Sequence, residues 1–128
     1  MTARLVLLLA FAGTFGVLLR FVIIRALAFG NGSFPWGTVA VNLLGCFLYG
    51  LLFVIMYERF QVSRDDVIYV AVLTGFLGAL TTFSSYAFDL YGFIVQKAWL
   101  NMSGYVLLQN FGGLGMLLVG MRLGRVLF

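Results

Sequence analysis

The sequence predicts an all-α membrane protein with four transmembrane helices. Of its 128 residues, 63% are hydrophobic and only 9% are charged, and the mean hydropathy is +1.11. This composition excludes a soluble globular domain and a disordered chain. Spans and connectors use nearly the whole chain, so we expect a single domain over residues 1–128. Each of four apolar segments reaches the roughly 20 residues that a helix needs to cross a bilayer, namely residues 5–29, 36–57, 67–95 and 102–123.

The first span carries a charged side chain, Arg20, deep within its apolar sequence. The apolar stretch is too long for a cleaved signal peptide and continues past Arg20 without a small-residue cleavage site. Ionisable residues inside a membrane usually face the bundle interior and are functional by default. Arg20 is therefore either an anion ligand or a structural cation bonded to carbonyl groups at a helix end, and we favour the structural role.

The second span begins after the only proline, Pro35, which suits the start of a helix. Its notable polar residue is Asn42, whose amide can donate two hydrogen bonds and accept others. Asn42 is either a clamp between helices or a donor that lines a conduction pathway, and we prefer the pathway role. Cys46, the only cysteine, is expected to pack as a small apolar side chain.

The third span is the most informative part of the chain. Glycines at 75 and 78 precede a run of hydroxyl residues around Phe83, namely Thr81, Thr82, Ser84 and Ser85. Irregular backbone at membrane depth is tolerated only inside protein or beside a watery cavity, because hydrocarbon offers no hydrogen-bond partners. The run therefore predicts that this helix is broken at the bilayer midplane and forms a transport site. The alternative is that the hydroxyls only bond to their own helix.

Two kinds of ion chemistry follow from such a break. Carbonyls freed near Gly78 and Thr81 suit a hard cation such as sodium, which prefers oxygen ligands. Phe83 and Tyr86 share a helical face, and the positive edges of their rings attract a small dehydrated anion. Such weak binding allows the anion to leave again, as conduction requires. The alternative is that both rings only pack.

The fourth span carries Tyr105, Gln109 and Asn110, and the connectors indicate the topology. An even number of spans places both termini on one side of the membrane. Five cations flank that side (Arg4, Arg59, Arg64, Arg122 and Arg125) and two flank the other (Arg25 and Lys97), so we expect both termini in the cytoplasm. Four helices pack around side chains and not around a pore, so a pathway needs a second subunit, for which glycine-rich faces allow close approach.

Enzymatic chemistry finds little support in the sequence. The chain has no histidine and a single cysteine, which removes Cys/His metal sites, disulfides and the common nucleophile–base pairs. Asp89 is the one acid inside a predicted span, and no partner base accompanies it. The cations are scattered over helix ends and form no aromatic-interleaved patch for nucleic acid. We therefore expect neither an enzyme nor a nucleic-acid-binding protein.

Three stretches of the chain resemble the Fluc/CrcB family of small fluoride channels. They are Gly16-Val-Leu-Leu-Arg20, Gly37-Thr-Val-Ala-Val-Asn42 and, as the best match, Gly75-Phe-Leu-Gly-Ala-Leu-Thr-Thr-Phe-Ser-Ser-Tyr86. Tyr105, followed by small residues through Gly113, fits the fourth span of the family. The Thr-Thr-Phe-Ser element together with the upstream Asn and Arg is fairly specific, whereas GxxxR alone is a weak signal.

The resemblance implies an antiparallel, dual-topology dimer with two fluoride pathways and one central structural sodium. It implies that carbonyls of Gly78 and Thr81 bind the sodium and that Arg20 is structural. Fluoride would leave the cytoplasm passively through the membrane. The residues that the resemblance places on or beside the fluoride pathway are Asn42, Thr82, Phe83, Ser84, Ser85, Tyr86, Tyr105 and Gln109.

Three residues depart from the family pattern: Tyr86 replaces a phenylalanine, Asp89 a glutamate and Gln109 a serine. The uneven distribution of cations favours one fixed orientation, which suits half of a heterodimer, although we favour the homodimer. The main rival function is a small four-helix multidrug or metabolite transporter. Such a transporter commonly needs an acid in its first span, and this chain has none there.

Overall fold

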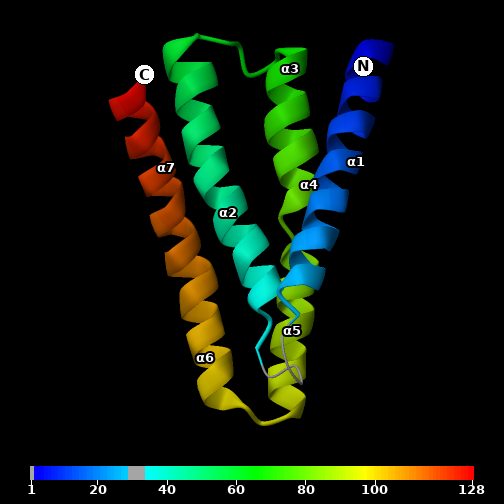
Figure 1. Cartoon of the computed structure of the whole chain (residues 1–128), viewed down its shortest axis with the longest axis vertical. Helices are drawn as coiled ribbons and strands as arrows, with labels where there is room; N and C mark the ends of the chain where they lie inside the picture. The colour runs from blue at the N-terminus through cyan, green and yellow to red at the C-terminus, as the bar shows by residue number, and fades with distance from the viewer. Residues whose placement is uncertain (1, 29–33) are drawn as a thin grey trace.

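The computed structural model describes residues 2–28 and 34–128, and no strand occurs among them. Four helical segments are long and apolar enough to cross a bilayer, so the chain is a multi-pass integral membrane protein: Ala3–Ala26, Trp36–Arg59, Val67–Val95 and Trp99–Leu127. They stand side by side, with both termini at one end of the bundle (Figure 1). The named elements are α1 (Ala3–Ala26), α2 (Trp36–Phe53), η1 (Val54–Arg59), α3 (Val67–Val70), η2 (Ala71–Leu77), α4 (Gly78–Leu80), α5 (Phe83–Val95), α6 (Trp99–Leu107), η3 (Leu108–Gly112) and α7 (Gly113–Leu127).

The predicted spans agree with these segments to within two residues except at two places. The first helix ends at Ala26, and the predicted end at Phe29 falls outside the described residues. The fourth segment begins at Trp99, before the predicted start at residue 102, and extends to Leu127, past the predicted end at residue 123. The earlier start has a local cause, because Lys97 has φ 55° and turns the chain sharply before α6.

Small residues bring the helices into close contact in two pairs. α2 packs along α7, and a Cβ atom on Gly50 would meet the carbonyl oxygen of Leu117. α1 packs on η2 and α4, and a Cβ atom on Gly16 would meet the carbonyl oxygen of Phe76. Backbones approach this closely only where no side chain intervenes, as is typical of helix packing in membranes. Gly16 of α1, Gly50 of α2 and Gly120 of α7 therefore serve packing within the chain.

The third segment changes its backbone conformation between α4 and α5. Thr81 (φ −81°, ψ 159°) and Thr82 (φ −148°, ψ 115°) are extended, and the link is visible between the two helices in Figure 1. We call these two residues the α4–α5 link. The wider π-helical turns of η2 precede the link along the chain, and such turns occur frequently at functional sites.

Two buried apolar clusters hold the third segment. One contains residues that precede the α4–α5 link in the sequence, and the other contains a residue that follows it. The first contains Leu73, Leu77 and Leu80, which pack with Val41 and Tyr69. The second contains Phe93 of α5, which packs with Val39 and Tyr105. Each half of the third segment is thus held by its own core, and the link between them is fixed at both ends.

Candidate functional site

The amide of Asn42 in α2 holds the α4–α5 link through two hydrogen bonds. The Thr82 backbone N–H donates to Asn42 Oδ1 at 2.8 Å, and Asn42 Nδ2 donates to the Thr82 carbonyl oxygen at 3.1 Å. In a continuous helix the Thr82 N–H would instead donate to the carbonyl of Gly78. Asn42 therefore replaces the missing helical partners of Thr82, which is the geometry of a clamp between helices.

Arg20 of α1 holds the other residue of the link. Its Nη1 donates to the Thr81 carbonyl oxygen at 3.2 Å, across 61 residues of sequence. The Thr81 hydroxyl donates back to the Leu77 carbonyl at 3.1 Å. The guanidinium thus bonds to a carbonyl at the end of a helix, the kind of contact that a structural cation makes.

The hydroxyl run forms the start of α5. Thr82 Oγ1 accepts a hydrogen bond from the Ser85 backbone N–H at 3.2 Å and so caps the helix. The same hydroxyl donates to Ser85 Oγ at 3.0 Å and lies 3.3 Å from Ser84 Oγ. Thr82 is buried, whereas Ser84 lies on the surface of this chain. The run is therefore a chain of hydroxyls that leads from the buried link to an exposed face.

Gln109 of η3 leaves one donor without a partner. Asn42 Nδ2 donates to Gln109 Oε1 at 3.2 Å, while Gln109 Nε2 is buried and has no hydrogen-bond partner among the described residues. The link fixes the orientation of the Asn42 amide. Asn42 turns its Oδ1 to the Thr82 N–H, so its Nδ2 lies on the other side of the amide group. Gln109 then has to present its oxygen to Asn42. Its buried amide nitrogen has no acceptor in hydrogen-bond geometry and lies near the Tyr105 hydroxyl, so an acceptor placed between the two side chains would satisfy it.

Aromatic side chains continue from the start of α5 toward α6. The rings of Phe83 and Tyr86 lie 5.6 Å apart between centroids, and those of Tyr86 and Tyr105 lie 5.3 Å apart. Phe83 is 78% exposed and Tyr105 is fully buried. Asn110 Nδ2 donates to the Tyr86 hydroxyl at 3.2 Å. The three rings therefore form a row from the surface of the chain into its interior.

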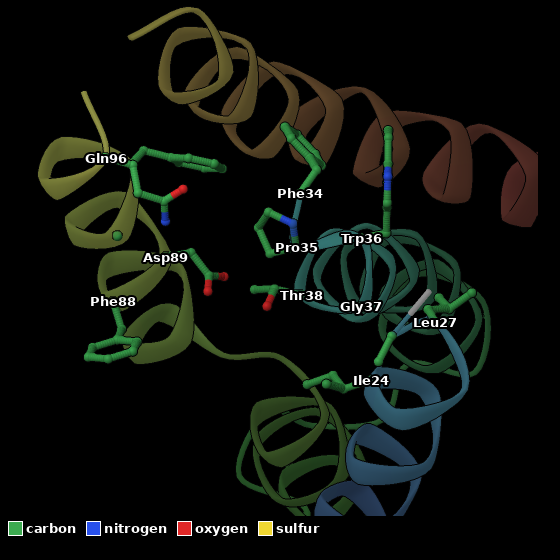
Figure 2. Close-up of a pocket in the computed structure, with 13 residues that line it drawn as sticks. Ile24, Leu27, Phe34, Pro35, Trp36, Gly37, Thr38, Phe88, Asp89 and Gln96 are labelled. Carbon is green, nitrogen blue, oxygen red and sulfur yellow. The ribbon is translucent and has the colours of Figure 1, made fainter. Parts of the chain in front are cut away.

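A cavity of about 350 Å³ opens farther along α5 (Figure 2). The Asp89 carboxylate and the buried hydroxyl residue Thr38 lie close together at its centre, and Gln96 lies beside Asp89. The Tyr105 hydroxyl donates to Asp89 Oδ2 at 2.7 Å. Tyr105 thus joins the row of aromatic rings to the cavity.

The structure brings together only some of the residues that the sequence predicted as a site. Asn42, Thr82 and Gln109 form one hydrogen-bonded group, which Arg20 adjoins through Thr81. Gly78, Phe83 and Ser84 instead lie on the exposed surface of this chain. Sequence reasoning did not select Thr38, Gln96 or Asn110 as site residues; Thr38 and Gln96 occupy the ends of apolar spans, where polar residues are common.

Backbone oxygens at the link fit a cation in part. Among the described residues no group of three or more His, Cys, Asp or Glu side chains could hold a metal ion. The Gly78 carbonyl has lost its helical donor to Asn42, and Gly78 lies in open space. The Thr81 carbonyl bonds to Arg20, and its oxygen keeps a second lone pair. The Gly78 carbonyl thus lacks the helical bond from Thr82, whereas the Thr81 carbonyl has Arg20 as a partner.

Comparison with known proteins gives consistent results. The family model described as CrcB-like protein, Camphor Resistance (CrcB), matches residues 7–121. A protein of Nitrosococcus oceani named fluoride-specific ion channel FluC is 37% identical over 122 residues, which are 93% of this chain and 94% of the relative. The FluC 2 channel of Listeria monocytogenes serotype 4b is 42% identical over 98 residues, which are 77% of this chain and 74% of the relative.

Proposed function

The chain belongs to the CrcB family, and on this premise we propose that it is a fluoride-specific channel that exports cytoplasmic fluoride passively across the membrane. Its relatives in Nitrosococcus oceani and Listeria monocytogenes carry the name of fluoride-specific ion channels. The function is transport and not catalysis. The α4–α5 link, which we place near the bilayer midplane, is the centre of the transport site.

The unpaired donor of Gln109 is the observation that supports this function best. A buried N–H group without an acceptor costs about 1–3 kcal/mol, so it persists where a ligand supplies the acceptor. A small dehydrated anion is such a ligand. The adjoining donors of Asn42 and Arg20 already bond to the link and hold its shape, and Asn42 also borders the pathway through its bond to Gln109.

Together with the Gln109 donor, the remaining polar and aromatic residues form the proposed pathway. Rings at Phe83, Tyr86 and Tyr105 would offer their positive edges to the ion without the strong hold of a fixed charge. The hydroxyls at the start of α5 would hydrogen-bond to it in turn. The proposed fluoride pathway therefore consists of Asn42, Thr82, Phe83, Ser84, Ser85, Tyr86, Tyr105 and Gln109.

Exposed features at the link support a dimer. Phe83 is 78% exposed, and a Cβ atom on Gly78 would meet nothing within 4 Å. We propose that an antiparallel second copy covers them, so that two links cross and two pathways form. The carbonyls of Gly78 and Thr81 from both copies would then surround one structural sodium, with Arg20 beside it.

A second arrangement is a heterodimer, and the distribution of cations favours it. Five cations on the side of the termini against two on the other would hold this chain in one orientation. One cysteine introduced into the loop between η1 and α3, in a Cys46→Ala background, separates the two arrangements. Labelling from both sides of the membrane supports the homodimer, and labelling from the cytoplasm alone supports the heterodimer.

Ion efflux from proteoliposomes tests the function itself. The purified protein is reconstituted, and fluoride and chloride release are recorded with ion-selective electrodes. We expect rapid fluoride release and little chloride release, because a larger ion fits the donors poorly and is not repaid for its lost hydration. Equal release of both ions, or of neither, would contradict the proposal.

A further inference from the structure

A hydrogen bond between Asn110 and Tyr86 joins η3 to the row of aromatic rings. Asn110 Nδ2 donates to the Tyr86 hydroxyl at 3.2 Å and to the Val106 carbonyl at 2.8 Å. The bond to Val106 ties the amide to its own helix, four residues back, and fixes the direction of the other N–H group. Both hydrogens of the amide nitrogen are then used. Asn110 therefore holds the Tyr86 oxygen in one position.

This hydrogen bond uses a lone pair of the Tyr86 oxygen and leaves its proton available. The Val106 carbonyl can only accept, so the Asn110 atom that faces both partners is the amide nitrogen, which can only donate. Tyr86 is therefore the acceptor, and its own proton has no acceptor among residues 2–28 and 34–128. Hydrogen bonds in a chain polarise one another, so the bond from Asn110 makes the Tyr86 hydroxyl a stronger donor.

Tyr86 lies within the proposed fluoride pathway. Its half-buried ring is 5.6 Å from that of Phe83 and 5.3 Å from that of Tyr105, between centroids. The unpaired amide nitrogen of Gln109 lies near the hydroxyl of the same Tyr105. Gln109 and Asn110 are consecutive residues of η3. One amide of this turn thus offers a donor to the pathway directly, and the next acts on it through Tyr86.

We propose that the Tyr86 hydroxyl donates a hydrogen bond to the permeating fluoride ion and that Asn110 is the positioning residue of this donor. The inference rests on the proposed function. A phenylalanine at this position offers only a ring edge, whereas a hydroxyl forms a stronger, charge-assisted bond to an anion. Tighter binding also slows the release that conduction requires. The pair therefore lowers the fluoride concentration at which transport is half-maximal and limits the maximal rate.

The concentration dependence of the fluoride current tests the role of Tyr86. The full-length protein is reconstituted in planar lipid bilayers, and fluoride currents are recorded over a series of fluoride concentrations. In Tyr86→Phe we expect the half-saturating concentration to rise about tenfold, because a hydrogen bond to a charged group is lost. The maximal current should stay equal or increase. A purely structural role of the hydroxyl would instead lower the maximal current and the thermal unfolding midpoint together.

Asn110→Leu tests the positioning role. In the parent background the half-saturating concentration should rise about threefold, because Tyr86 keeps its hydroxyl but loses the bond that orients it. In the Tyr86→Phe background the same change should have no further effect, since no hydroxyl remains to be oriented. Asn101→Leu is the matched control, because it removes another exposed amide from the same membrane-spanning segment. It should leave the concentration dependence unchanged.

The possible outcomes separate this inference from the proposed function. An unchanged half-saturating concentration in Tyr86→Phe or in Asn110→Leu would overturn the inference while the parent protein still conducts fluoride. Equal effects of Asn110→Leu in the two backgrounds would also overturn it, because Asn110 would then act without Tyr86. Absence of any fluoride current in the parent protein would contradict the proposed function itself, and this inference with it.

Discussion

The α4–α5 link and the cavity beside Asp89 belong to the same membrane-spanning segment, yet different polar groups surround them. At the link, donors gather: the Arg20 guanidinium, the Asn42 amide and the unpaired Gln109 Nε2. In the cavity a carboxylate faces neutral side chains and receives one hydrogen bond, from Tyr105. The residues that begin α5 are separated from Asp89 by about two helical turns. Two parts of one membrane-spanning segment can therefore differ in polar character because different neighbours surround them.

Phe83→Ile is expected to give the largest effect, because it tests whether an aromatic edge is needed at the link. Isoleucine fills a similar volume but has no positive ring edge, so fluoride efflux should be almost abolished while assembly stays intact. Efflux is measured in proteoliposomes, and assembly by size-exclusion chromatography in detergent.

Phe11→Ile is the matched control for this change. Phe11 is 76% exposed, close to the 78% of Phe83, and belongs to α1 and not to the helix that carries the hydroxyl run. Its replacement should leave efflux near the parent rate. Near-normal efflux in Phe83→Ile would show that Phe83 only packs.

Gln109→Met tests the unpaired donor and should separate stability from transport. Methionine keeps the length of the side chain but removes the buried amide that lacks a partner, so the protein should become no less stable. Asn42 Nδ2 keeps its bond to the Thr82 carbonyl. Fluoride efflux should fall about tenfold, because one donor to the ion is lost. Thermal unfolding in detergent and proteoliposome efflux measure the two quantities.

The opposite pattern would change the interpretation of Gln109. If stability falls and efflux stays high, Gln109 is a structural residue that holds Asn42 in place. Gln109→Glu sharpens the comparison, since a carboxylate offers no N–H donor and adds a negative charge beside the link. We expect it to lower efflux more than Gln109→Met does.

The number and approximate positions of the spans followed from composition, whereas the partners at the link did not. Apolar length alone indicated all four spans, and the Gly and hydroxyl run falls where Thr81 and Thr82 are extended. The bond from Asn42 to Thr82 spans 40 residues and that from Arg20 to Thr81 spans 61. Such pairs depend on how the helices rotate and slide against each other, which one sequence does not specify.

The early start of α6 and the partners of Asp89 were missed for similar reasons. Lys97 takes a left-handed conformation that a lysine rarely adopts, so no local signal placed the turn there. Asp89 drew attention only as the one acid inside a predicted span and as a departure from the family pattern. Its contact with Tyr105 and its place in a cavity depend on packing between α5, α6 and the start of α2.

Tyr105→Phe tests the cavity side of the comparison and should mainly affect stability. The substitution removes the 2.7 Å bond to Asp89 Oδ2 and leaves the carboxylate with less compensation. A hydrogen bond to a charged group contributes about 1.5–3 kcal/mol, so the thermal unfolding midpoint should fall clearly. Tyr86→Phe is the control, because the bond that it removes, from Asn110, is neutral and exposed. Equal effects of the two changes would indicate that the bond to Asp89 contributes no more to stability than the bond from Asn110.

Thr81→Ser should have the smallest effect, and its mildness is what the sodium proposal requires. Serine keeps the backbone carbonyl and can keep the hydroxyl bond to Leu77 that Thr81 makes at 3.1 Å. Serine lacks the methyl group of Thr81 that lies against Gly45. Full burial of such a group contributes about 0.8 kcal/mol to stability. Efflux should therefore stay near the parent rate in sodium buffer. A severe loss would mean that the side chain and not the carbonyl carries the role of Thr81, and the proposed sodium site would then lose one of its two ligands.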